Sequence, residues 1–136
     1  RAEIERVGRL GDGVITTYVT EDDIVRLRAA CHEAFAKHGR ARAELPLCVY
    51  TTVRIEPDAA KAERATRAFL DRYYGGGVNF RGLMGLGPPS AVIDVLKRYQ
   101  AAGVTDVCIR FAGEDQLEQL QQFVADVLPA FTTHSR

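Results

Sequence analysis

The chain has 136 residues, and its 18 Lys and Arg balance 18 Asp and Glu, so the formal net charge is zero. Domains commonly have ~100–150 residues and 46% of this chain is hydrophobic, so we expect one globular domain over residues 1–136. The charge balance disfavours a nucleic-acid partner, and no apolar run reaches the ~18 residues that span a membrane.

The first part of the chain predicts a helix, a strand and a second helix. Apolar residues have helical spacing over residues 2–10, and Gly11-Asp12-Gly13 then ends that helix. Residues 14–19 are β-branched or aromatic, which is typical of a strand. Thr20 and Asp23 have the spacing of a capping box, which predicts the start of the next helix.

The rest of the chain continues this alternation of strands and helices. Six glycines and two prolines at 74–89 predict a long loop. The other expected elements are a strand at 47–55, a helix at about 58–73, a helix at about 89–102, a strand at 104–111 and a helix at about 114–127. Strands that alternate with helices indicate βαβ units and a parallel sheet.

Three strands are few for such a sheet. An eight-stranded barrel needs ~250 residues. The chain opens on a helix-like segment and its only methionine is Met84, so we expect a piece of a longer barrel. A small open three-layer domain, or a chain trimmed by a few residues, remains the alternative.

Four segments, taken in order, resemble one family. None is specific alone, but their order and spacing together resemble the C-terminal part of bacterial-luciferase-like oxidoreductases. These segments are Arg6–Ile15, Tyr73–Gly75, Gly87–Val92 and a last stretch from Tyr99 to Pro129.

This resemblance implies a fold and an activity. The fold would be α/β, a partial (βα)₈ TIM barrel made of the C-terminal three βα units, and the strands would be the sixth, seventh and eighth. The enzyme would use FMN or the deazaflavin coenzyme F420, for hydride transfer or for oxygen activation on reduced flavin, with a small organic substrate. The family's catalytic acid or base belongs to the other half, so we assign no catalytic residue and expect this chain alone to be inactive.

Barrel active sites lie at the carboxyl ends of the strands. We therefore expect Ile15, Thr17 and Tyr18 to contact the cofactor. Packing at the strand end is the alternative interpretation.

We expect four further residues to bind substrate. Asn79, Phe80 and Arg81 lie in the glycine-rich loop, and Arg110 lies near the end of the last strand. A solvated loop arginine is the alternative for Arg81.

Arg54 and Arg110 both sit at strand ends, where a cation could hold a phosphate or carboxylate. For both, the alternative is an ion pair with an acidic residue nearby: Glu56, Glu114 or Asp115.

We expect no metal site. The three cysteines are widely spaced and read as core residues, and His32 and His38 lie six apart on one helix, which is not the spacing of paired zinc ligands. The odd cysteine count favours a reduced cytoplasm.

Two other functions stay open. The chain could be a stand-alone, non-catalytic half-barrel that serves as a dimeric interaction module, because open barrel edges expose unpaired backbone. A small phosphate-ligand binder is a weaker alternative. For the oxidoreductase and the module alike, we expect a homodimer.

Overall fold

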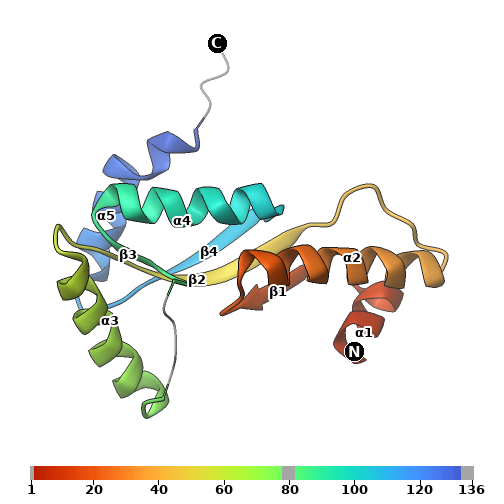
Figure 1. The fold of residues 1–136 in the computed structure, drawn as a ribbon, viewed down its shortest axis with the longest axis horizontal. Helices are drawn as coiled ribbons and strands as arrows, with labels where there is room; N and C mark the ends of the chain where they lie inside the picture. The colour runs from red at the N-terminus through yellow and green to blue at the C-terminus, as the bar shows by residue number, and fades with distance from the viewer. Residues whose placement is uncertain (1, 78–81, 133–136) are drawn as a thin grey trace. The chain divides into compact units, whose positions relative to one another are not determined.

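A computed structural model describes residues 2–77 and 82–132 (Figure 1). Its elements are α1 (Ala2–Leu10), β1 (Val14–Thr17), α2 (Glu21–Lys37), β2 (Leu47–Ile55), α3 (Ala59–Tyr74), β3 (Gly85–Gly87), α4 (Pro89–Ala102), β4 (Asp106–Phe111), α5 (Gln116–Asp126) and a short 3₁₀ turn (Leu128–Ala130). The residues cluster into a first unit, 1–50 with 98–108, and a second unit, 51–97 with 109–136. The single domain expected from the sequence stays a prediction.

Strand β2 is the centre of the sheet. β1 pairs with its first half in parallel, from Val14 beside Leu47 to Thr17 beside Tyr50. β3 pairs in parallel with its second half, and β4 also pairs with β2. The parallel pairing of β1 and β3 with β2, with helices between the strands, confirms the α/β arrangement that the sequence predicts.

In the first unit, α2 begins where the sequence predicts. The Thr20 amide donates to Asp23 Oδ2 at 3.0 Å, and the Asp23 amide donates to Thr20 Oγ1 at 3.2 Å. The backbone N–H of Thr20, its hydroxyl and Arg26 together lower the pKa of Asp23 to about 2. The capping box is therefore confirmed.

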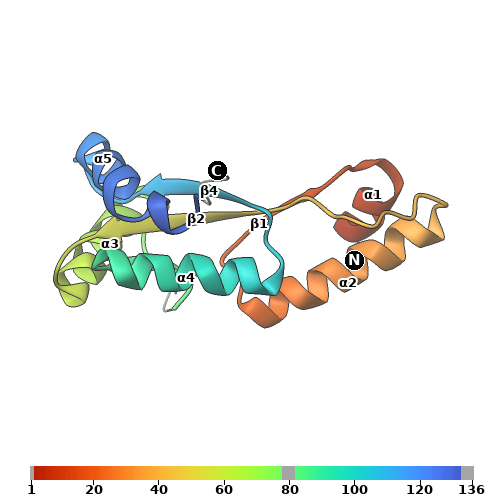
Figure 2. The ribbon, with the colours of Figure 1, turned by 90° about the horizontal axis from the view of Figure 1, so that it is seen from above.

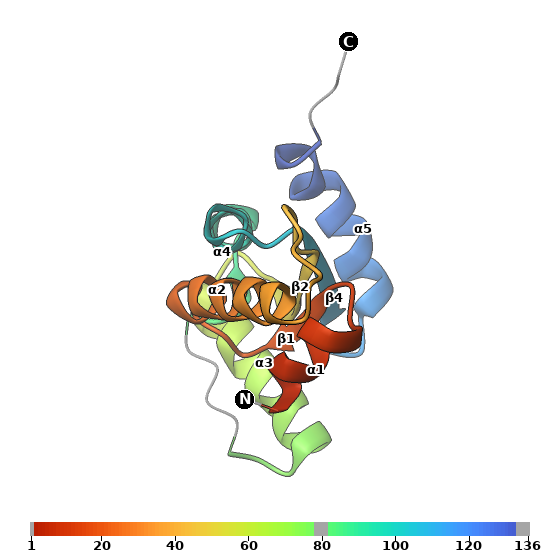
Figure 3. The same ribbon diagram turned by 90° about the vertical axis from the view of Figure 1, so that its right-hand side faces the viewer.

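Helices α1 and α2 lie side by side in the first unit (Figure 3). Gly8 permits this approach, because a Cβ there would lie 2.6 Å from Ala34 Cβ. Cys31 is fully buried near Phe35, as expected of a core cysteine. The same expectation is wrong for Cys108, which is exposed on β4.

In the second unit, the first part of α4 and helix α5 lie on different sides of the second half of β2 (Figures 2 and 3). Buried Gln119 on α5 donates to the Ile55 carbonyl at 3.1 Å and accepts from the Ile55 amide at 2.7 Å. Phe111 and Phe123 meet edge to face with ring centroids 5.8 Å apart. These contacts fix α5 against the ends of β2 and β4.

The structure corrects part of the loop predicted at 74–89. Gly85–Gly87 forms the short strand β3, and α4 begins at Pro89. A strand of two glycines around Leu86 has no alternation of apolar side chains, so its sequence gives no strand signal. It forms because its backbone pairs with Val53–Ile55. Glycine also suits this close packing, because a Cβ on Gly85 would lie only 3.1 Å from Val92 Cγ1.

Within the described parts of the chain, no helix has the length and apolar character needed to cross a membrane.

Candidate functional site

The carboxyl end of β1 presents an open face in the first unit. Side chains alternate along a strand, so Ile15 and Thr17 share one face. Ile15 is 65% exposed, and the Thr17 hydroxyl donates to the Tyr50 carbonyl at 2.9 Å. Their register partners on β2 are Cys48 and Tyr50, which are half-buried, whereas Leu47 and Val49 on the alternate face are fully buried.

Tyr18 follows β1 directly and ends it. Its φ is 53°, the only positive φ of a non-glycine among the described residues. A bulky side chain in this region costs of order 1–3 kcal/mol, and such residues concentrate at functional sites. The turn ends the strand at Thr17, two residues earlier than predicted. Ile15, Thr17 and Tyr18 thus lie at the carboxyl end of β1, and their contact with a cofactor stays a prediction.

In the second unit, Arg110 is held by hydroxyl groups. Its Nε and Nη2 donate to Thr52 Oγ1 at 3.2 and 3.0 Å. Its Nη1 donates to the Tyr74 hydroxyl at 3.2 Å. Thr52 is 2% exposed, so its hydroxyl is a fixed anchor for the guanidinium.

Three rings from the last turns of α3 also surround Arg110. Its Cζ lies 5.6 Å from the Phe69 ring centroid, and 5.5 Å from those of Tyr73 and Tyr74. The Phe69 and Tyr73 rings are stacked, with centroids 6.4 Å apart and planes inclined by 17°. Tyr73 is 66% exposed, so this cation–aromatic cluster faces solvent.

Arg54 forms ion pairs, which is the alternative interpretation given for it in the sequence analysis. Its side chain is 12% exposed, and Nη2 donates to Glu56 Oε1 at 2.6 Å. Nη1 pairs with Asp115 and also donates to the Ala112 carbonyl at 3.0 Å. Lys61 binds the other oxygen of Glu56 at 2.9 Å.

These pairs shift the pKa values of both acids. Lys61 and then Arg54 hold the pKa of Glu56 below its usual 4.5. Arg54 holds the pKa of Asp115 below its usual 3.8. Arg54 is therefore a structural link between the ends of β2 and β4.

Gly113 makes this link possible. Its φ is +122°, and a Cβ there would lie 2.5 Å from Arg54 Nη1 and 2.7 Å from Asp115 Oδ1. Only glycine tolerates both the conformation and the contact.

Three expected substrate residues, Asn79, Phe80 and Arg81, lie outside the described residues. Arg110 is described, and its aromatic neighbours were not predicted as site residues. Their signal was present in the sequence: Phe69 and Tyr73 are four apart on a helix, which places them on one face. Among the described residues, no cluster of His, Cys, Asp and Glu could hold a metal ion.

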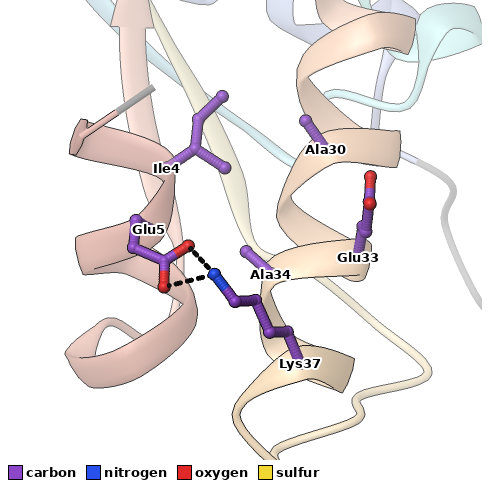
Figure 4. A pocket seen from close by; sticks show the side chains of 6 residues that line it. All are labelled: Ile4, Glu5, Ala30, Glu33, Ala34 and Lys37. Carbon is purple, nitrogen blue, oxygen red and sulfur yellow. Dashed lines mark hydrogen bonds and ion pairs between the residues drawn. The ribbon is translucent and has the colours of Figure 1, made fainter.

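The first unit also has a cavity of about 530 Å³ between α1 and α2 (Figure 4). Its walls are Ile4, Glu5, Ala30, Glu33, Ala34 and Lys37. Lys37 Nζ donates to both oxygens of Glu5, at 3.0 and 3.1 Å. Because this ion pair ties the two helices together across the cavity, we interpret the cavity as a feature of helix packing.

Comparison with known proteins places this geometry in context. The model of one family, described as luciferase-like monooxygenase, matches residues 1–106. No curated protein matches the chain.

Several solved structures have a similar fold. An F420-dependent secondary alcohol dehydrogenase, solved with an F420–acetone adduct, has a TM-score of 0.80 at 14% identity, over 97% of this chain and 46% of its own. The coenzyme F420-dependent tetrahydromethanopterin reductase of Methanopyrus kandleri has a TM-score of 0.73 at 18% identity, over 95% and 48%. A monooxygenase from Streptomyces bottropensis has a TM-score of 0.68 at 15% identity, over 96% and 45%.

The chain therefore spans under half the length of these structures. The likeness confirms the partial barrel expected from the sequence.

Proposed function

The chain belongs to the luciferase-like monooxygenase family, and we therefore propose that it is part of an oxidoreductase that uses FMN or coenzyme F420. The cofactor would supply hydride transfer, or oxygen activation on reduced flavin. The chain would contribute barrel strands, part of the cofactor surface and part of the substrate pocket. Alone, it would lack the catalytic acid or base.

The observation that carries this proposal is the open face at the end of β1. A flavin or deazaflavin ring is flat and largely apolar, with polar atoms at its rim. Ile15 offers an exposed apolar side chain, and the Thr17 hydroxyl lies two residues further along the same face. The strained Tyr18 backbone adds a feature typical of ligand sites. These residues fit the ring part of the cofactor.

On the substrate side, the proposal assigns Arg110 a binding role. Its guanidinium is fixed by Thr52 and by the Tyr74 hydroxyl, so it can orient a substrate without first being ordered itself.

Cofactor titration tests the proposal. FMN and coenzyme F420 are added separately to the polypeptide made from the gene, and quenching of their fluorescence gives the affinity. The informative variant is Tyr18→Gly, because glycine accepts a φ of 53° and the fold is retained. We expect binding of one cofactor and a loss of about tenfold in affinity in the variant, roughly the value of one good contact.

Tyr99→Phe is the control variant. Tyr99 is 2% exposed and its hydroxyl donates to the Val19 carbonyl at 3.5 Å, so the substitution changes a buried side chain and not the exposed face of β1. Its cofactor affinity should equal that of the unmodified chain. Failure of both cofactors to bind, or equal affinity in the Tyr18→Gly variant, would contradict the proposal.

A second candidate function, the dimeric interaction module, is favoured by one surface of α5. Four apolar side chains at helical spacing on this helix and the turn after it are between 39% and 64% exposed: Leu117, Leu120, Val124 and Leu128. Apolar rows of this kind commonly mark protein contacts. We propose that the protein is a homodimer.

The oligomeric state tests this second proposal. Light scattering on a size-exclusion column should give twice the mass of one polypeptide. The double variant Leu120→Glu with Val124→Glu should give the mass of a monomer. The control variant Glu118→Gln should remain a dimer. A monomer at all concentrations up to ~100 μM would contradict the dimer and remove the support for a module, since stable complexes form well below that concentration.

A further inference from the structure

A smaller cavity of the first unit has a lining that carries both signs of charge. We infer that it is a binding site for a small zwitterion: a molecule with a carboxylate and an ammonium group on a short apolar body, such as a free α-amino acid. This site is separate from the cofactor and substrate sites proposed above.

The cavity lies at the amino ends of β2 and β4 and has a volume of about 270 Å³. Pro46 in its wall directly precedes β2, and Thr105 directly precedes β4. Ala43 and Leu45 add apolar surface that suits a body of a few carbon atoms. Barrel active sites lie at the opposite, carboxyl ends of the strands, so a ligand here would not be the substrate.

Arg28 of α2 supplies the positive charge of the cavity. Its Nε is buried without a hydrogen-bond partner, and its guanidinium forms no ion pair with another described residue. Arg28 as a whole is only partly buried, and it lines the cavity.

Gly103 fixes the position of this guanidinium. Its φ is +100°, and a Cβ there would lie 2.2 Å from Arg28 Nη1 and 2.6 Å from Arg28 Cζ. Buried polar groups are nearly always paired. An arginine that is held in place and has no partner is therefore suited to the carboxylate of a ligand.

Glu44 and Asp106 supply the negative charges. Both are exposed and line the same cavity, but within the described part of the chain neither forms an ion pair with Arg28. The Thr105 hydroxyl donates to Asp106 Oδ2 at 2.7 Å and accepts from the Leu47 amide at 2.9 Å, which ties this carboxylate to the start of β2.

The arrangement of these charges selects the class of ligand. A simple anion would bind Arg28 but would be repelled by Glu44 and Asp106, and a simple cation would meet the reverse. A zwitterion places its carboxylate against the arginine and its ammonium group against the acids, so both signs are matched.

The test measures binding of L-leucine to the polypeptide made from the gene, by titration calorimetry. 4-Methylpentanoate has the same body and carboxylate but no ammonium group, and 3-methylbutylamine has the body and the ammonium group but no carboxylate. We expect L-leucine to bind at least about tenfold more tightly than either, since each of them lacks one charged contact. Equal affinity for L-leucine and either analogue would overturn the inference, and so would no binding of L-leucine up to ~10 mM.

Three variants locate the site. Arg28→Met keeps the length of the side chain but removes its charge and its unpartnered donor. It should weaken L-leucine by at least about tenfold without lowering the stability of the ligand-free protein, whereas loss of a purely structural arginine would lower that stability. Asp106→Asn retains an oxygen that can accept from Thr105 and should also weaken L-leucine.

Arg26→Met is the matched control, because Arg26 is 70% exposed on the same helix and pairs with Asp23 at 2.7 Å. Its affinity for L-leucine should be unchanged. Full affinity in Arg28→Met would overturn the inference.

Thermal unfolding separates this site from the cofactor face of β1. A ligand that binds only the folded state stabilises it, so saturating L-leucine should raise the unfolding midpoint. Arg28→Met should lose this shift and Tyr18→Gly should keep it. The reverse result would place the amino acid at the end of β1 and overturn the inference.

Discussion

Gly113 shows how one residue without a side chain sets the geometry of several others. Its positive φ and the space that it leaves allow Arg54 to reach Asp115 and the Ala112 carbonyl. The sequence predicts that Arg54 is near acidic residues, because Glu56 and Asp115 both follow strands. It cannot predict the partner choice, since that depends on a backbone conformation that sequence spacing does not encode.

Substitution of Gly113 should therefore be costly. Gly113→Ala combines a strained φ of +122° with a clash against Arg54, and should lower the free energy of unfolding by about 2–4 kcal/mol. Gly75→Ala is the matched control, because Gly75 has a φ of +77° but nothing within 4 Å of a Cβ, and should cost about 1 kcal/mol. Urea unfolding measures both. Equal losses would contradict a steric role for Gly113.

The ion pairs of Arg54 also predict a dependence of stability on pH. The pKa values of Glu56 and Asp115 are lowered in the folded state, so their contribution is complete above their usual values of 4.5 and 3.8. It is lost as the pH falls through the lowered values. The free energy of unfolding should therefore decrease below about pH 4.5.

Arg54→Met tests this origin. At neutral pH it should cost about 3 kcal/mol, because it leaves Asp115 without its main partner and Glu56 with Lys61 alone, at a partly buried site. It should also flatten the acid decrease. Arg72→Met is the control: Arg72 and Glu114 pair at 2.9 Å with side chains 74% and 88% exposed, so the loss should stay below about 1 kcal/mol. An unchanged acid profile in Arg54→Met would refute the assignment.

At the scale of elements, periodicity and caps predict the long helices and strands well. The capping box of Thr20 and Asp23 marks the start of α2, and β2 has the bounds expected. The short strand β3 could not be predicted, because backbone pairing and the absence of a Cβ form it. The spacing of Phe69 and Tyr73 places both on one face of α3, but their packing around Arg110 is a tertiary contact that the sequence does not show.

The packing of α1 on α2 gives a prediction at this scale. Gly8→Ala would raise helix propensity by up to ~1 kcal/mol. The new Cβ, however, would lie 2.6 Å from Ala34 Cβ and 2.7 Å from its backbone carbon and oxygen, which cannot rotate away. Overpacking of this kind costs about 1–3 kcal/mol, so the net effect should be destabilising. Thermal unfolding followed by circular dichroism checks the sign, and a raised midpoint would contradict this helix contact.

At the scale of the whole molecule, the family resemblance of the sequence is confirmed by the match over residues 1–106 and by the shared fold. The cofactor, the substrate and the homodimer are proposals, and the cytoplasmic location stays a prediction. Local sequence patterns cannot supply the cofactor, the substrate or the oligomeric state, because a barrel site is assembled from the ends of several strands, and the solved structures of similar fold are about twice as long as this chain.

The intact mass and the visible absorption spectrum of the polypeptide made from its gene test the central claim most directly. We predict a mass about twice the 15.0 kDa of this chain, since the chain spans 46% of a solved structure of similar fold. We also predict the absorption band of a bound flavin or deazaflavin, either as purified or after addition of the cofactor. A mass of 15.0 kDa with no cofactor bound would contradict the oxidoreductase assignment and leave the dimeric module as the function to test.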